Sequence, residues 1–157
     1  MRTIALSCCV AIVVGCTRTD REPATDTAAG TAAPAPSSTV SLADFAGRWD
    51  VRSKPESGTD TSTTQYVLTA TSDSTGWTLV FPGRSEPVAV RVVAVEGDSI
   101  VTEAGPFASV RRRGVQVTTR SVFRREGDRL VGSTRARYVS TGADSVLVLR
   151  TEGTRAP

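Results

Sequence analysis

Histidine is absent from the 157-residue chain, and its three cysteines, Cys8, Cys9 and Cys16, all lie near the N-terminus. Everything after Cys16 therefore lacks the ligands of a Cys/His zinc site, the nucleophile of a cysteine hydrolase and the base of a Ser-His-Asp triad. No disulfide can form within that region, so a packed core must stabilise any domain there. The sequence carries no catalytic signature, and we do not expect an enzyme.

Lysine is almost absent as well, since Lys54 is the single one and arginine provides the other positive side chains. Lysine and arginine total 19, aspartate and glutamate total 16, and the formal net charge is +3. The two signs are scattered along the chain and form no basic stripe of the kind that binds nucleic acid. We therefore expect no nucleic-acid partner.

Long hydrophobic runs are missing apart from one short apolar segment at the N-terminus. The basic start Met1-Arg2 is followed by an apolar stretch from Ile4 to Val14 and then by Gly15-Cys16. This stretch is too short for a transmembrane helix, which needs about 20 apolar residues. The pattern predicts a secretory signal at residues 1–15, which is removed from the mature protein.

The small residues in Val13-Val14-Gly15-Cys16 resemble the lipobox of bacterial lipoproteins. That resemblance implies cleavage just before Cys16 and attachment of fatty-acyl groups such as palmitate to this cysteine. More than one acyl chain gives stable anchoring, so the resemblance implies a bacterial envelope protein on the non-cytoplasmic side of a membrane. Thr17, where an aspartate would favour the inner membrane, favours the outer one. An ordinary secretory signal cut elsewhere is the alternative.

Residues 16–40 form a linker rich in Thr, Ala, Pro, Ser and Asp. The segment 31–38 has no apolar periodicity, so it cannot bury enough surface to offset the entropy of ordering it. We expect a flexible tether that precedes a single domain at residues 41–157.

Beyond Val40 the apolar pattern has a period of two, and its short runs are separated by Gly, Pro, Asp and Ser. The repeated turn sequences Glu96-Gly97-Asp98 and Glu126-Gly127-Asp128 indicate hairpins between consecutive strands. Each run has one apolar and one polar face, which favours an all-β, up-and-down antiparallel barrel of eight or nine strands. The expected strands are 47–53, 63–71, 76–81, 88–95, 99–103, 107–112, 115–125, 129–139 and 145–151.

The sequence Phe45-Ala46-Gly47-Arg48-Trp49-Asp50 places a Gly-x-Trp element on the first expected strand. This element resembles the start of lipocalin-like barrels. The resemblance implies that Trp49 packs at the closed end of the barrel under an arginine of the last strand. Arg150 is the first candidate for that partner and Arg155 the second. The resemblance also implies a small apolar ligand in the lumen rather than a reaction.

Small and hydroxylated residues on the inward faces of the two longest strands are candidate ligand contacts. Such residues would leave a cavity with a few polar anchors, as ligand pockets need. The alternative is that they simply fill a narrow eight-stranded interior. The candidate ligand-binding residues, aromatic ones included, are Trp49, Trp77, Phe81, Thr119, Ser121, Thr134 and Tyr138.

Arginines form a second candidate site, which includes Arg111-Arg112-Arg113 at an expected turn. They either bind phosphate or acidic polymers or belong to a solvated face offset by carboxylates such as Glu103 and Glu126. The outward-facing members on two neighbouring strands are Arg120, Arg124, Arg135 and Arg137.

Carboxylates give little sign of a reactive site. Asp98, Asp128 and Asp144 occupy equivalent turns, where turn chemistry accounts for them. No run of alternating acidic residues fits a calcium loop, and we expect neither a metal site nor a cofactor. Two carboxylates that meet in space would be the one route to glycosidase-type catalysis.

These observations together predict a membrane-anchored envelope lipoprotein whose barrel binds a small apolar or amphipathic ligand. The alternative is a non-enzymatic structural or interaction module with a filled barrel. The volume of the lumen separates the two, because an open mouth and an apolar cavity above about 300 Å³ favour binding.

Overall fold

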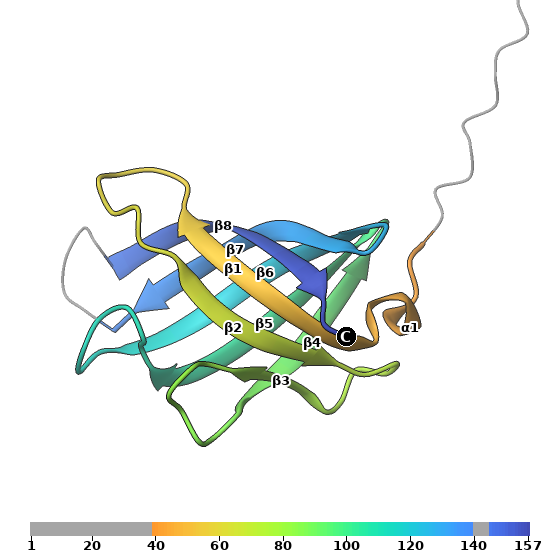
Figure 1. Cartoon of the computed structure of the whole chain (residues 1–157), viewed down its shortest axis with the longest axis horizontal. Helices are drawn as coiled ribbons and strands as arrows, with labels where there is room; N and C mark the ends of the chain where they lie inside the picture. The colour runs from red at the N-terminus through yellow and green to blue at the C-terminus, as the bar shows by residue number, and fades with distance from the viewer. Residues whose placement is uncertain (1–38, 140–144) are drawn as a thin grey trace, which may run out of the picture. The chain divides into compact units, whose positions relative to one another are not determined.

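The computed structural model describes residues 39–139 and 145–157, which form one short helix and eight strands (Figure 1). The expected signal, Cys16 and nearly all of the expected linker lie outside these residues, as does Asp144. The elements are α1 (Leu42–Phe45), β1 (Gly47–Pro55), β2 (Thr64–Ala70), β3 (Trp77–Val80), β4 (Val88–Glu96), β5 (Ser99–Ala108), β6 (Gln116–Glu126), β7 (Arg129–Tyr138) and β8 (Val146–Arg155).

The strands form a closed barrel in sequence order, and each pairs antiparallel with its neighbours. Closure comes from β8 and β1, whose pairing extends from Trp49 opposite Arg155 to Pro55 opposite Leu149. No sheet edge is left open, so the barrel avoids the unpaired backbone groups that promote edge-to-edge association. The expected all-β, up-and-down barrel is confirmed, with eight strands.

The expected strand 107–112 is not a separate element of the described chain. Phe107 and Ala108 continue β5, which begins at Ser99, and residues 109–112 belong to the segment that connects β5 to β6. The register with β6 shifts between Ala104 and Phe107, where Gly105 has a φ of 108°. A Cβ at Gly105 would lie 2.6 Å from the carbonyl oxygen of Val117. The Gly105-Pro106 pair therefore bends a continuous strand, and it does not divide the strand in two.

Alternation of side chains along the strands builds the core. On β1, Trp49, Val51 and Ser53 are buried, whereas the intervening Arg48, Asp50 and Arg52 are exposed. The same inward and outward alternation continues around the barrel, as a period of two requires. The interior is therefore one contiguous cluster of apolar side chains with a few hydroxyl groups among them.

One end of the barrel, which we call the helix end, is closed by α1 and by Trp49. Ser41 and Asp44 form a capping box at the start of α1. The indole Nε1 of Trp49 donates to the carbonyl oxygen of Phe45 at 2.7 Å, and both side chains are buried. This hydrogen bond fixes the helix against the first strand. Among the described residues, no helix is long and apolar enough to span a membrane.

Arg155 is the arginine that packs on Trp49, and the expected pairing with Arg150 is wrong. The guanidinium carbon of Arg155 lies 4.5 Å from the ring centroid of Trp49, and its Nη1 donates to the carbonyl of Ala46 at 2.6 Å. The side chain of Arg150 is 74% exposed and bonds Glu152 on the outer surface. Arg150 and Arg155 are an odd number of residues apart, so a strand directs them to opposite faces.

Candidate functional site

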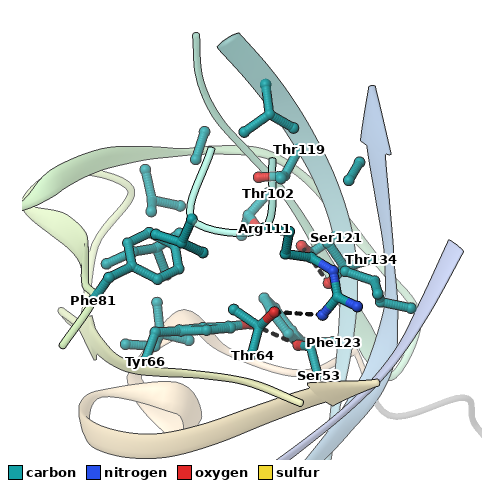
Figure 2. Close-up of a pocket in the computed structure, with 18 of the residues that line it drawn as sticks. Ser53, Thr64, Tyr66, Phe81, Thr102, Arg111, Thr119, Ser121, Phe123 and Thr134 are labelled. Carbon is teal, nitrogen blue, oxygen red and sulfur yellow. Dashed lines mark hydrogen bonds between the residues drawn. The ribbon is translucent and has the colours of Figure 1, made fainter. Parts of the chain in front are cut away.

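A cavity of about 50 Å³ lies inside the barrel, toward the end opposite α1. Figure 2 shows residues that line it. We call this the loop end, because the segments 56–63, 81–87 and 109–115 connect strands there (Figure 1). One part of the wall is apolar and includes Leu68, Leu79, Phe81, Val90, Val117 and Phe123. Another part carries the hydroxyls of Ser53, Tyr66, Thr102, Thr119, Ser121 and Thr134.

Five hydroxyl groups from five adjacent strands form a chain along the polar side of the lumen. Ser121 on β6 lies 2.9 Å from Thr134 on β7, and Thr134 lies 3.0 Å from Thr151 on β8. Thr151 lies 2.8 Å from Ser53 on β1, which has a longer contact of 3.5 Å with the hydroxyl of Tyr66 on β2. The chain therefore joins β6, β7, β8, β1 and β2 from inside the barrel.

The hydroxyl chain has one more donor than it has internal bonds. Each hydroxyl carries one proton, and four contacts join the five groups. Because the Ser53 hydroxyl donates to the Tyr66 oxygen, the other links donate from Ser121 toward Ser53, and the proton of Tyr66 has no acceptor within the chain. Hydrogen bonds in such a chain polarise one another. An acceptor placed near Tyr66 would therefore strengthen the whole chain.

Tyr66 keeps its proton over a wide pH range. Burial raises the pKa of its phenol, while hydrogen bonds with Ser53, Thr151 and Thr134 oppose that rise. The hydroxyl is therefore an uncharged donor at neutral pH, and the polar wall of the cavity carries no negative charge there.

Arg111 covers the cavity at the loop end (Figure 2). It belongs to the segment 109–115 between β5 and β6, where the Ser109 side chain accepts from the backbone nitrogens of Arg111 at 3.1 Å and Arg112 at 3.0 Å. The Arg111 side chain crosses to the start of β2 and to the segment before it. There Nη1 donates to the Thr64 hydroxyl at 2.6 Å and Nη2 to the Asp60 carboxylate at 2.6 Å.

The guanidinium of Arg111 is buried even though its ionic partner is not. The Arg111 side chain is only 10% exposed, compared with 55% for Asp60. Its terminal nitrogens also donate to the Ser62 hydroxyl at 2.8 Å and to the Ser62 carbonyl at 3.2 Å. Its Nε is buried, and no group of the described residues accepts a hydrogen bond from it.

The pKa of Asp60 is lowered to about 2. The largest causes are hydrogen bonds from the side chain and backbone of Ser62, followed by the hydrogen bond from Arg111. The carboxylate is therefore ionised at any physiological pH and stays available to hold Arg111 over the cavity.

Five of the seven expected ligand contacts line this cavity, namely Phe81, Thr119, Ser121, Thr134 and Tyr138. Trp49 and Trp77 do not. Each is fully buried, and its indole Nε1 donates to a nearby backbone carbonyl. Trp49 donates to the carbonyl of Phe45, and Trp77 donates to that of Asp73. Both are core residues, and neither is among the residues that line the cavity.

Sequence reasoning missed Tyr66, Ser53 and Arg111 as parts of the site. The alternation Tyr66, Leu68, Ala70 within an expected strand was the signal that would have placed Tyr66 inside. The run Arg111-Arg112-Arg113 indicates exposed arginines, but Arg111 is buried by partners about 50 positions earlier in the chain. The sequence held no local signal for that contact.

Two of the four outward arginines, Arg120 and Arg124, have the carboxylate partners expected of a solvated face. Glu103 bridges Arg91 and Arg120, at 2.7 Å and 2.6 Å. Arg124 pairs with Glu126 at 2.5 Å and lies 3.8 Å from Asp98. Arg135 and Arg137 are exposed on β7. Within residues 39–139 and 145–157, no three Cys, Asp or Glu side chains come together in a way that could hold a metal ion.

Comparison with known proteins gives no match: no family model, curated protein or solved structure resembles the chain significantly.

Proposed function

We propose that this chain is a lipid-anchored protein of the bacterial envelope whose β-barrel binds a small apolar or amphipathic molecule in its lumen, without catalysing a reaction. The observation that carries the proposal is the cavity at the loop end, which has an apolar wall, a hydroxyl wall and the buried guanidinium of Arg111 above it. Apolar surroundings with a few convergent polar groups are what small-molecule sites need.

The volume of the cavity limits the ligand. About 50 Å³ is far below the roughly 300 Å³ at which drug-sized ligand pockets begin. A ligand that fits beneath Arg111 as it stands is therefore very small, and a larger one needs the segment 109–115 to move outward. Such movement would break the contacts of Arg111 with Asp60, Ser62 and Thr64, all of which lie near the barrel surface.

The described chain enters the barrel at the helix end. The backbone nitrogen of Val40 donates to the carbonyl of Gly97 at 2.9 Å, and α1 follows there. The loop end, to which the cavity and Arg111 belong, is the opposite end of the barrel (Figure 1).

A second function, that of a structural or interaction module with a filled barrel, is favoured by the same small volume. The hydroxyls of the chain also make most of their hydrogen bonds with one another. Buried polar groups in a core without a ligand are paired in this way. The two functions differ in what they predict for a variant that fills the remaining space.

Native mass spectrometry of protein isolated from its own cells tests the proposal. We expect a bound small molecule in the wild-type barrel and its loss in Ala136→Leu, since Ala136 is buried in the cavity wall. Ala104→Val provides a second, milder filling variant. Thr118→Leu is the matched control, because Thr118 is exposed on the outer face of the neighbouring strand. A wild-type barrel that is always free of ligand would favour the filled module.

A further inference from the structure

We infer that the lumen selects an uncharged ligand that carries a hydrogen-bond acceptor, and that the Nε–H of Arg111 donates to this acceptor. The inference rests on the proposed function and specifies the chemical class of its ligand. Three observations carry it: the number of donors on Arg111, the charge of its partner, and the neutrality of the rest of the cavity wall.

The donors of Arg111 are almost fully used. A guanidinium has five N–H groups, and four hydrogen bonds from Nη1 and Nη2 reach Thr64, Asp60 and Ser62. The fifth donor, Nε–H, belongs to a side chain that is nine-tenths buried and lines the cavity, and no described residue accepts from it. A buried donor without an acceptor is costly, so a water or ligand atom beside Arg111 must satisfy it.

The charge of Arg111 is already balanced. Its Nη2 lies 2.6 Å from a carboxylate oxygen of Asp60. An anionic ligand would bring a second negative charge to this buried ion pair, and it could bind well only by displacing Asp60. An uncharged acceptor such as a carbonyl satisfies Nε and leaves the pair intact, so it avoids the desolvation of an uncompensated charge.

The remaining wall supports the same conclusion. Among the described residues that line the cavity, Arg111 is the only one with a charged side chain, and the other polar groups are hydroxyls. Tyr66 stays protonated because burial opposes its ionisation. None of these residues offers a second cation to a carboxylate or phosphate.

Three probes with at most three carbon atoms, small enough for a cavity of about 50 Å³, separate charge from hydrogen bonding: propane, acetone and acetate. Each is titrated into the ¹⁵N-labelled full chain, and the side-chain Nε–H signal of Arg111 is followed with the amides of Thr119, Ser121 and Thr134. We expect acetone to bind about tenfold more tightly than either other probe, since one hydrogen bond from a charged donor is worth about that factor. We also expect only acetone to shift the Nε–H signal strongly.

Two variants assign the preference to the ion pair. Arg111→Lys keeps a positive charge near Asp60 but has no Nε, so the tenfold preference for acetone over propane should vanish. Arg113→Lys, the same change at an exposed position of the same segment, should retain it. Asp60→Asn leaves Arg111 without its anionic partner, so acetate should bind about tenfold better than to the wild type. Asp128→Asn, in an exposed turn, should not change that affinity.

The outcomes separate this inference from the proposed function. If propane or acetate binds as tightly as acetone, the lumen is a binding site but the inferred selectivity is wrong. If Arg111→Lys prefers acetone over propane as strongly as the wild type does, Nε does not donate to the ligand, and water is its acceptor. If no probe perturbs the lumen amides at millimolar concentration, the proposed function fails and the inference fails with it.

Discussion

Arg155 lies with its guanidinium carbon 4.5 Å from the ring centroid of Trp49, across the pairing of the last strand with the first. The same side chain donates to the carbonyl of Ala46 at 2.6 Å and to that of Asp44 at 3.4 Å. One residue near the C-terminus therefore holds α1, the start of β1 and the closure of the barrel together.

Replacing Arg155 with alanine should lower the free energy of unfolding by about 1–2 kcal/mol, because a cation–π contact and charged hydrogen bonds are lost together. Arg150→Ala is the matched control on the same strand. Its side chain is 74% exposed and paired with Glu152 on the surface, so its effect should stay within about 0.5 kcal/mol. Urea unfolding of both variants measures the difference, and equal effects would contradict the role of Arg155.

The barrel was predictable because its signal is local and repeated. Alternation along each strand and the Gly-Asp turns at 97–98 and 127–128 are properties of short segments, and they place neighbouring strands in contact without further information. The choice between Arg150 and Arg155 depends instead on which face of β8 each residue occupies. That parity is fixed by the register with β1, which the sequence of β8 alone does not contain.

The candidate site was only partly predictable for a related reason. Inward positions such as Thr119, Ser121 and Thr134 follow from the alternation of β6 and β7. Arg111 lies in a connecting segment without periodicity, and its partner Asp60 is 51 positions away in another such segment. A contact of this kind arises from the three-dimensional closure of the loop end, so no local pattern identifies it.

Thr151 is the central link of the hydroxyl chain, and Thr151→Val should destabilise the barrel by about 1–3 kcal/mol. The side chain is fully buried and contacts Ser53 at 2.8 Å and Thr134 at 3.0 Å. Valine preserves the shape but leaves both neighbouring hydroxyls short of a partner. Thr154→Val, at an exposed position of the same strand, is the control, and chemical denaturation of the two variants is the measurement. If Thr151→Val leaves the free energy of unfolding unchanged, the hydroxyl chain contributes nothing to stability.

Acid should loosen the cover of the cavity through Asp60. The pKa of this carboxyl in the folded protein is lowered to about 2, below its ordinary value of 3.8. A lowered folded pKa means that the ionised carboxylate favours the folded state above pH 4, and that this contribution is lost as the pH falls toward 2. Unfolding free energies of wild type and Asp60→Asn, measured from pH 5 to pH 2, should therefore converge at the acidic limit. The other carboxyls titrate in both proteins, so only Asp60 can change the difference between the two free energies of unfolding. If that difference stays constant from pH 5 to pH 2, Asp60 has no such role.

Cys16 lies outside the described residues, and its acylation is a prediction from the sequence alone. Expressed in a bacterial host, the full chain should fractionate with membranes, and its mature N-terminus should carry the added mass of the acyl groups. Cys16→Ala should remain unacylated and lose membrane association, because the chain then has no residue for the lipid. Cys9→Ala is the matched control: Cys9 belongs to the expected signal, so the mature protein should be unchanged. An unmodified N-terminus in the wild type would refute the anchor, while the cavity beneath Arg111 and its expected ligand would still be open to test in the freely secreted barrel.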